Sequence, residues 1–85
     1  EQIKKIDKNT YIVSADLTIR DINDYLDISL KENDEKYHTL RGLYIYLLGY
    51  IPTPKNTQSL VHENVELSIN SFTDENISNI VIKIL

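Results

Sequence analysis

The side chains best suited to acid–base chemistry or metal binding in this 85-residue sequence are two histidines and the carboxylates near them. His38 follows Asp34 and Glu35, and His62 is followed directly by Glu63. Metal motifs place histidines at HxH or HExxH spacing on one element, whereas these two histidines are 24 positions apart in the numbering. We therefore expect no metal site, with one histidine at a helix entry, the other at a hairpin tip, and both exposed to water.

Two groups of carboxylates could be considered as ligands for a divalent cation: Asp21, Asp24 and Asp27, and Glu32, Asp34 and Glu35. Neither group follows the spacing of an EF-hand loop. The first group falls mostly on the outer face of a predicted helix, so both groups are interpreted as solvated surface. With no cysteine, no serine at a nucleophile elbow and no histidine beside a local activating partner, the sequence predicts that the domain is not an enzyme.

The charge of the chain argues against nucleic acid as a partner. The formal net charge is −4 with a pI near 5.0, and only Lys4, Lys5 and Lys8 gather, which is typical of a solvated strand edge. Three of the six tyrosines lie within residues 44–50 and could stack on bases, but the negative charge opposes this. Packing in a core or an interface is the expected role of these tyrosines.

The whole chain, residues 1–85, is predicted to be a single domain. No apolar run reaches the eighteen residues that a membrane span requires, and the beginning of the chain has no signal-peptide pattern. We therefore expect no direct membrane insertion by this domain. Because the sequence contains no methionine, it is interpreted as a fragment of a longer protein.

The central element of the predicted fold is a short apolar helix, Leu40–Leu48. Thr39 is suited to be its N-cap, Gly49 is suited to end it in a left-handed conformation, and Pro52 prevents its continuation. One face carries leucines and Tyr44, and the opposite side carries Gly42, Ile45 and Tyr46. A helix this apolar on most sides is expected to be covered on most sides, by a sheet beneath it and by a further contact against Gly42 and Tyr46.

An earlier helix is predicted over Ile19–Asp27, with Thr18 as its N-cap and Asp21 in a weak capping box. Its apolar face is expected to carry four side chains, Ile19, Ile22, Tyr25 and Leu26. On its outer side, Arg20 and Asp24 are four residues apart and are expected to pair.

Strand patterns flank the two helices. Two strands at Gln2–Asp7 and Tyr11–Ala15 are joined by a turn in which Asn9 is suited to a left-handed position. Polar loops are expected at 28–38 and, with its two prolines, at 51–56. A short strand at 58–62 and alternating segments at 65–69 and 80–84 follow, with turns at Glu63-Asn64 and Thr73–Asn76. The order β-β-α-α-β-β-β predicts an α+β fold in which both helices pack on one face of a mainly antiparallel sheet.

Laid out in this way, nearly the whole chain resembles the CorC/HlyC-type transporter-associated domain. The signature of that family is a threonine, a glycine three residues on, and an ending Leu-Gly-x-Ile-Pro. The matching positions are Thr39, Gly42, Leu48, Gly49, Ile51 and Pro52, supported by the segment YIVSADLTIRDINDYL and by Tyr37. Two departures are Pro54-Lys55-Asn56, where a Gly-Asp turn is usual, and Lys8-Asn9, where a glycine is common.

The resemblance implies a regulatory domain at the C-terminal end of a bacterial ion-transport protein. Such domains follow a transmembrane domain and a pair of CBS domains in magnesium and cobalt efflux or hemolysin-like proteins, and they lie on the cytoplasmic side of the inner membrane. The expected function is non-catalytic modulation of transport by docking to the CBS or transmembrane domains of the same chain, with a homodimer as another arrangement. Gly42, Tyr46 and Tyr50 are the predicted contact residues, unless the loop from Pro52 to Asn56 covers them.

The fold implied by the resemblance is similar to an FAD-binding subdomain of flavoenzymes. A flavin- or nucleotide-binding module is therefore the alternative function, although fold likeness is a poor warrant for it. Phosphate binding would require a glycine-rich loop, and the two glycines of this chain are already assigned to the second helix. No cofactor is therefore predicted. The sequence does not reveal which ion the parent protein moves.

Overall fold

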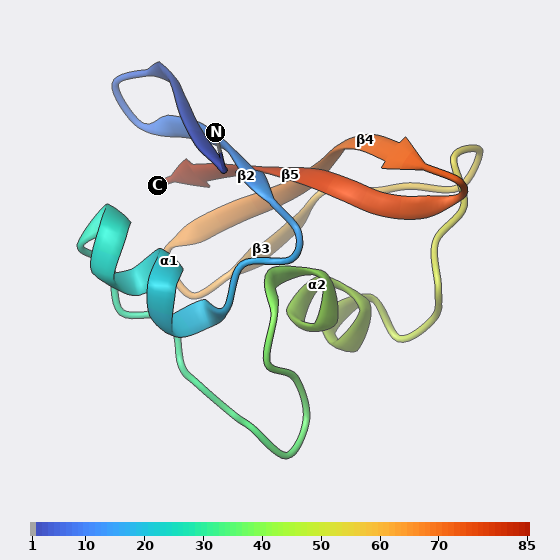
Figure 1. The fold of residues 1–85 in the computed structure, drawn as a ribbon, viewed down its shortest axis with the longest axis horizontal. Coiled ribbons are helices and arrows are strands. Elements are labelled where there is room, and N and C mark those ends of the chain that lie inside the picture. Colours follow the sequence, from blue (N-terminus) through green and yellow to red (C-terminus); the bar gives the residue numbers. More distant parts are fainter. Residues whose placement is uncertain (1) are drawn as a thin grey trace.

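The computed structural model describes residues 2–85, which form a five-stranded antiparallel sheet with two helices on one of its faces (Figure 1). The elements are β1 (Ile3–Asp7), β2 (Thr10–Ser14), α1 (Ile19–Leu26), α2 (Leu40–Leu48), β3 (Leu60–His62), β4 (Val65–Thr73) and β5 (Asn76–Ile84). The predicted α+β class and the order β-β-α-α-β-β-β are both confirmed.

The last strand of the chain lies in the middle of the sheet. The strand order is β1-β2-β5-β4-β3, and every pair is antiparallel. β2 and β5 are far apart in the sequence, so the sheet is complete only when the last strand of the chain has paired with β2. β1 is an edge strand whose Lys4 and Lys5 are exposed, and Lys8 in the following turn is also exposed, which confirms the predicted solvated edge.

The core lies between the sheet and the helices. Along β5, Ile80 and Ile82 are completely buried, whereas Lys83, which follows Ile82, is exposed. This pattern is expected for a sheet covered on one face. The helices contribute the other half of this core, with α2 supplying the most voluminous of its fully buried side chains, Tyr44.

The bounds of α2 agree with the predicted helix residue for residue. The Oγ1 atom of Thr39 accepts a hydrogen bond from the Gly42 N–H at 3.2 Å, and Gly49 ends the helix at φ +90°. The Gly49 N–H donates to the Ile45 carbonyl at 2.9 Å. Both end signals act within four residues, so neither depends on a partner from a distant part of the chain.

The second predicted helix begins where expected but ends one residue early, and one of its side chains is not buried. The Thr18 Oγ1 atom accepts from the Asp21 N–H at 3.1 Å, as predicted, and α1 ends one residue early because Asp27 adopts a left-handed conformation (φ 55°). The predicted burial of Tyr25 is wrong, since 68% of this residue is exposed. At 100° per residue, Tyr25 lies about 90° around the helix from the centre of the face that meets the core.

Two further expectations are corrected at the surface. Arg20 does not pair with Asp24: its Nε atom lies 3.6 Å from Glu32 Oε1, in the loop between the helices. Asn9 does not adopt a left-handed backbone conformation. The first turn is held by the Asn9 N–H, which donates to the Asp7 carboxylate at 3.1 Å. This bond is also the main reason why the pKa of Asp7 is lowered.

The two late hairpins turn where the sequence predicts. Glu63 has a φ of 55° between β3 and β4, and Asp74 and Glu75 have φ values of 52° and 66° between β4 and β5. Two consecutive positive φ angles match the right-handed twist of the strands that they join. Both strands extend to this turn, so β4 and β5 are longer than their apolar alternation indicates.

No helix within residues 2–85 combines the length and the apolar character needed to cross a membrane.

Candidate contact surface on the second helix

Two polar side chains of α2 fix this helix to the rest of the fold. Arg41 donates from Nε and Nη2 to the Ile77 carbonyl of β5, at 3.0 and 2.6 Å, and from Nη1 to Asp16 at 2.6 Å. Its backbone N–H also donates to the Ala15 carbonyl at 2.9 Å. One guanidinium thus joins α2 to the central strand and to the segment that follows β2.

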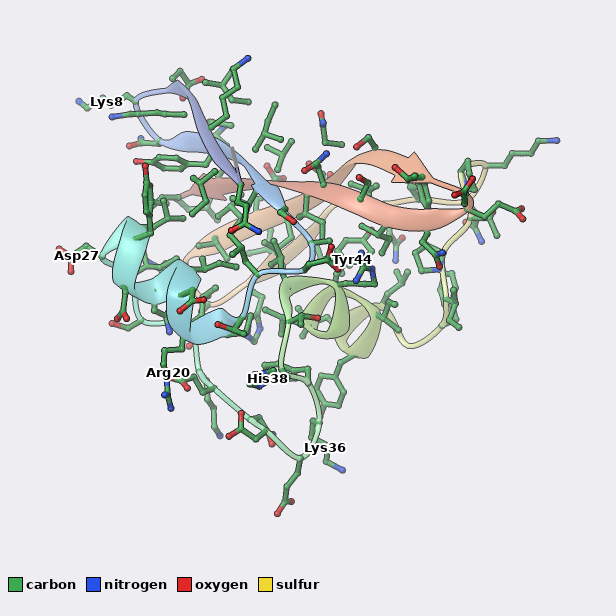
Figure 2. All side chains as sticks on the ribbon, viewed as in Figure 1. Lys8, Arg20, Asp27, Lys36, His38 and Tyr44 are labelled. Atoms are coloured by element: carbon green, nitrogen blue, oxygen red, sulfur yellow. The ribbon has the colours of Figure 1, made fainter. Side chains whose placement is uncertain are left out.

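Tyr44 is the second anchor. Its ring lies between α2 and the sheet (Figure 2), and the residue is completely buried. The phenol donates to the Gln58 carbonyl, and the Gln58 N–H lies 3.4 Å from the same oxygen. The loop between α2 and β3 contains no helix or strand. It is held in place by the hydroxyl of the buried Tyr44 side chain.

The side of α2 that carries Gly42 is covered by the chain itself. A Cβ added at Gly42 would lie 3.3 Å from the Cβ of Tyr37, so the glycine allows this tyrosine to approach the helix closely. The Tyr37 ring then extends to Tyr46, with ring centroids 5.5 Å apart and an interplanar angle of 43°. This is the further contact expected against Gly42 and Tyr46, and it comes from the loop that precedes α2.

Beyond this contact, three large apolar side chains remain exposed at the end of α2. The exposed fractions are 51% for Tyr46, 43% for Tyr50 and 75% for Ile51. Pro52, next in the chain, is fully buried, so it fixes the position at which this exposed stretch ends. We call Tyr46, Tyr50 and Ile51 the aromatic surface.

The loop between the helices is fixed at both ends by side chains that the sequence analysis did not single out as anchors. The Asn23 amide of α1 donates to the Leu30 carbonyl at 2.8 Å and accepts from the Leu30 N–H at 2.9 Å. The Tyr37 hydroxyl donates to the Lys31 carbonyl at 2.7 Å. These bonds pair partly buried polar groups of the loop backbone, and the loop thereby holds Tyr37 against α2.

The polar residues weighed as a metal or catalytic site are partly brought together, because Asp21, Glu32, Asp34 and His38 line one cleft. His38 and Asp34 lie beside a cleft of about 270 Å³ between the start of α1 and the following loop, with His38 Nδ1 3.3 Å from Asp34 Oδ1. Both side chains are mostly exposed, as expected for His38, which Figure 2 shows in this loop region. Among residues 2–85, no three His, Asp or Glu side chains are grouped as metal binding requires.

His62 is less exposed than expected. Its side chain is 25% exposed, and its Nε2 atom lies 3.2 Å from Glu63 Oε2 without forming a hydrogen bond of acceptable angle. The same carboxylate oxygen accepts the Lys31 N–H at 3.1 Å. The expectation that both histidines are exposed is therefore wrong for His62, because the β3–β4 turn meets the loop between the helices here.

Neither glycine is placed in a phosphate-binding loop. Gly42 lies inside α2 against Tyr37, and Gly49 ends the helix.

Burial raises the pKa of Tyr37 and Tyr44, and the nearby negative charge of Glu63 raises that of Tyr37 further. A phenol is neutral when protonated, so its contribution to stability is complete below the unfolded pKa near 10 and is lost as pH rises through the higher folded value. We predict that the free energy of unfolding in urea falls as the pH rises above about 10. Tyr44→Phe should weaken this dependence, whereas Tyr25→Phe, at an exposed position, should leave it unchanged. Equal alkaline dependence in all three proteins would contradict the assignment.

The fold and this arrangement define a small α+β domain whose polar side chains hold its own loops in place and which exposes three large apolar residues together at the end of one helix. A sequence profile of the CorC_HlyC family, described as the transporter-associated domain, matches residues 4–85. The chain belongs to this family.

Three comparisons illustrate how similar the chain is to its relatives. The polyamine export protein of Haemophilus influenzae is 25% identical over 85 residues, which is 100% of this chain and 19% of that protein. The transporter-associated domain of a CBS domain protein from Porphyromonas gingivalis has a TM-score of 0.85 at 19% identity, covering 100% of this chain and 99% of that one. The CorC_HlyC domain of a Xylella fastidiosa hemolysin, solved with Mg²⁺ and Mn²⁺, has a TM-score of 0.78 at 20% identity, covering 100% and 99%.

This chain thus spans about a fifth of the length of the curated relative that it matches. The domain is a module found in larger transporter-like proteins. The metal ions are a property of the Xylella fastidiosa structure.

Proposed function

We propose that this domain is a non-catalytic regulatory module that docks, through the aromatic surface, onto the CBS domains of its own parent transporter. The observation that carries the proposal is the exposure of Tyr46, Tyr50 and Ile51 within six residues of one another. Tyrosine is enriched in protein interfaces because one side chain provides apolar area and a polar group together.

Parts of the aromatic surface are held in place by contacts within the domain. Tyr46 rests against Tyr37, whose hydroxyl is bonded to the Lys31 carbonyl at 2.7 Å, and Pro52 behind Ile51 is buried in the domain. A partner that binds here therefore orders few side chains, which lowers the entropic cost of association. The aromatic residues are the expected hot spots.

The partner that we favour belongs to the same chain. A structural relative of similar length belongs to a CBS domain protein, and the curated relative is about five times longer than this chain. An attached partner is present at high effective concentration, so a surface of three residues is sufficient for docking that can be reversed. A second copy of the domain is the competing occupant, which the test below distinguishes.

Docking of this kind would modulate transport by favouring one arrangement of the CBS pair over another. The module would then act from the cytoplasmic side of the bacterial inner membrane. The names of the relatives refer to polyamine export and to hemolysin, and the family resemblance refers to magnesium and cobalt efflux, so we infer that the cargo of the parent is a cation.

The test places a charge in the aromatic surface of the full-length parent. We expect Tyr46→Asp or Tyr50→Asp to weaken docking by about tenfold or more, since a carboxylate must lose its water in the interface. Docking is measured by cross-linking between this domain and the CBS pair, and regulation by transport rates in vesicles. Tyr50→Asp is the cleaner variant because it leaves the contact between Tyr37 and Tyr46 intact.

Ile6→Asp is the matched control, because Ile6 is 52% exposed and lies on the edge strand β1, away from α2. It should leave docking and transport unchanged. Normal docking and transport in both tyrosine variants would contradict the proposal. Loss of a homodimer with the CBS contact retained would instead assign the aromatic surface to a second copy.

A further inference from the structure

His62 is a titratable side chain that the proposed docking role leaves without a part. It lies on β3, where Leu60 and His62 point to the helix side of the sheet and Val61 between them is 67% exposed. The His62 Nε2 atom is closed off from water and makes no hydrogen bond, although Glu63 Oε2 lies 3.2 Å away. A buried polar atom without a partner costs free energy, so a neutral imidazole is poorly accommodated here.

Glu63, the residue that follows, occupies an unfavourable backbone position. Its φ of 55° lies in the left-handed region, which glycine and asparagine adopt more readily than glutamate. Its carboxylate accepts the Lys31 N–H at 3.1 Å, which ties the β3–β4 turn to the loop between the helices. One carboxylate oxygen therefore faces both His62 and this loop.

From Lys31, further contacts lead to the aromatic surface. The Lys31 carbonyl accepts the Tyr37 hydroxyl at 2.7 Å, and the Tyr37 ring lies against Tyr46 with the ring centroids 5.5 Å apart. The backbone of Lys31 is thus held on one side by Glu63 and on the other by Tyr37. A change at His62 reaches Tyr46 through these three residues.

The titratable and charged groups around His62 come from its own turn and from the loop between the helices. They are Glu63, the exposed Lys31 and the phenol of Tyr37, whose pKa is raised by burial and further by the charge of Glu63. On β4, the strand partner of His62 is the buried Val65, and Glu66 beside it points to the other face of the sheet. The charged and phenolic side chains of α2 are engaged elsewhere: Arg41 on Ile77 and Asp16, Tyr44 on Gln58, and Tyr46 on Tyr37. A change of charge on His62 therefore acts first on Glu63.

We propose that protonation of His62 fastens the loop between the helices to the β3–β4 turn and thereby steadies Tyr37 beneath Tyr46. An imidazolium attracts the Glu63 carboxylate whatever the hydrogen-bond angle, because Coulomb attraction depends on distance. Histidine changes its charge between about pH 5 and about pH 8, so the attraction is present at the acid end of this range and is lost toward the alkaline end. The consequence for docking rests on the proposed function: acidification favours the docked state, because Tyr46 is then better ordered.

The contact itself is tested by NMR of this 85-residue domain across that pH range. We expect the Lys31 amide proton and the ring protons of Tyr37 and Tyr46 to shift in step with the His62 imidazole. After correction for the intrinsic exchange rate, the Lys31 amide should be protected about fivefold better at the acid end, the scale of a partly exposed ion pair. Glu63→Gln keeps an acceptor for the Lys31 N–H but removes the charge, so it should abolish both effects while the His62 imidazole still titrates.

His38→Gln is the matched control, because His38 is next to Tyr37 in the chain and lies 3.3 Å from Asp34. It should leave the response of the Tyr37 and Tyr46 rings unchanged, whereas His62→Gln should remove that response. The thermal midpoint of each variant shows that it is folded. A ring response that survives in His62→Gln or vanishes in His38→Gln would overturn the proposal, as would protection of the Lys31 amide that is independent of pH.

A second measurement separates this proposal from the docking proposal. In the full-length parent, cross-linking between the domain and the CBS pair should be stronger at about pH 6 than at about pH 8, and Glu63→Gln should remove this difference. Tyr50→Asp should weaken docking at both pH values and leave the NMR response of the isolated domain intact. Docking of equal strength at both pH values would overturn the link between His62 and the aromatic surface, whereas absence of docking in the unmodified parent would contradict only the proposed function.

Discussion

Tyr44→Ala will lower the free energy of unfolding by about 3–5 kcal/mol, the range typical of an aromatic side chain removed from a core. Tyr44 is completely buried between α2 and the sheet, so its loss leaves a cavity that neighbouring side chains cannot fill without moving. The measurement is urea unfolding of the domain followed by circular dichroism.

Tyr44→Phe separates the ring from the hydroxyl. It should cost only about 1 kcal/mol, the typical net worth of a hydrogen bond, because the ring remains and only the bond to the Gln58 carbonyl is lost. Amide hydrogen exchange near Gln58 should become faster in this variant while exchange in β5 is unchanged. Equal stability losses in the two variants would show that the hydroxyl, and not the packing, holds α2 in place.

Arg41→Ala has the second largest expected effect, a loss of about 2–3 kcal/mol, in line with hydrogen bonds made by charged groups. The change removes both bonds to the Ile77 carbonyl in the central strand and the contact with Asp16. Arg41→Lys should recover little of this loss, because an ammonium cannot reproduce the planar fork that places Nε and Nη2 on one oxygen. Chemical unfolding of both variants provides the measurement.

Asp16→Asn is the control for the ionic part of this arrangement. Asp16 is largely exposed, and exposed ion pairs contribute about 1 kcal/mol or less. If Asp16→Asn were as damaging as Arg41→Ala, the stabilisation would arise from the ion pair and not from the bonds to β5.

The parts of the fold that the sequence predicts are those whose signals are local. Thr39 and Gly49 determine the ends of α2 within four residues, and Asp74-Glu75 lies in the predicted turn between β4 and β5. Alternation of isoleucines identified the last strand, but alternation has no information about partners, so its central place in the sheet was not predicted.

The parts that were missed depend on contacts between distant residues. Arg41 was noted only as the single charge of the apolar helix, yet it reaches Ile77, 36 positions later. Asn23 and Tyr37 fix the loop between the helices through backbone groups that have no sequence signature. The exposure of Tyr25 was not predicted, because the residue lies about 90° from the centre of the buried face of α1 and the sequence does not define how wide that face is.

The candidate site was predicted in outline. Tyr46 and Tyr50 are exposed, and their role as contact residues stays a prediction. Gly42 has a different part: it admits Tyr37, which supports Tyr46 from inside the domain. A glycine in a helix indicates close approach of another group, but its sequence position does not say whether that group belongs to the same chain.

The most direct test of the docking role is hydroxyl-radical footprinting of the aromatic surface in the full-length parent and in the isolated domain. We predict that Tyr46, Tyr50 and Ile51 are modified at least about fivefold more slowly in the parent, since a docked interface excludes water. Val61, which is 67% exposed on β3, should be modified equally in both. Equal modification of the aromatic surface in the two proteins would contradict the proposal that this helix end is where the domain meets its parent.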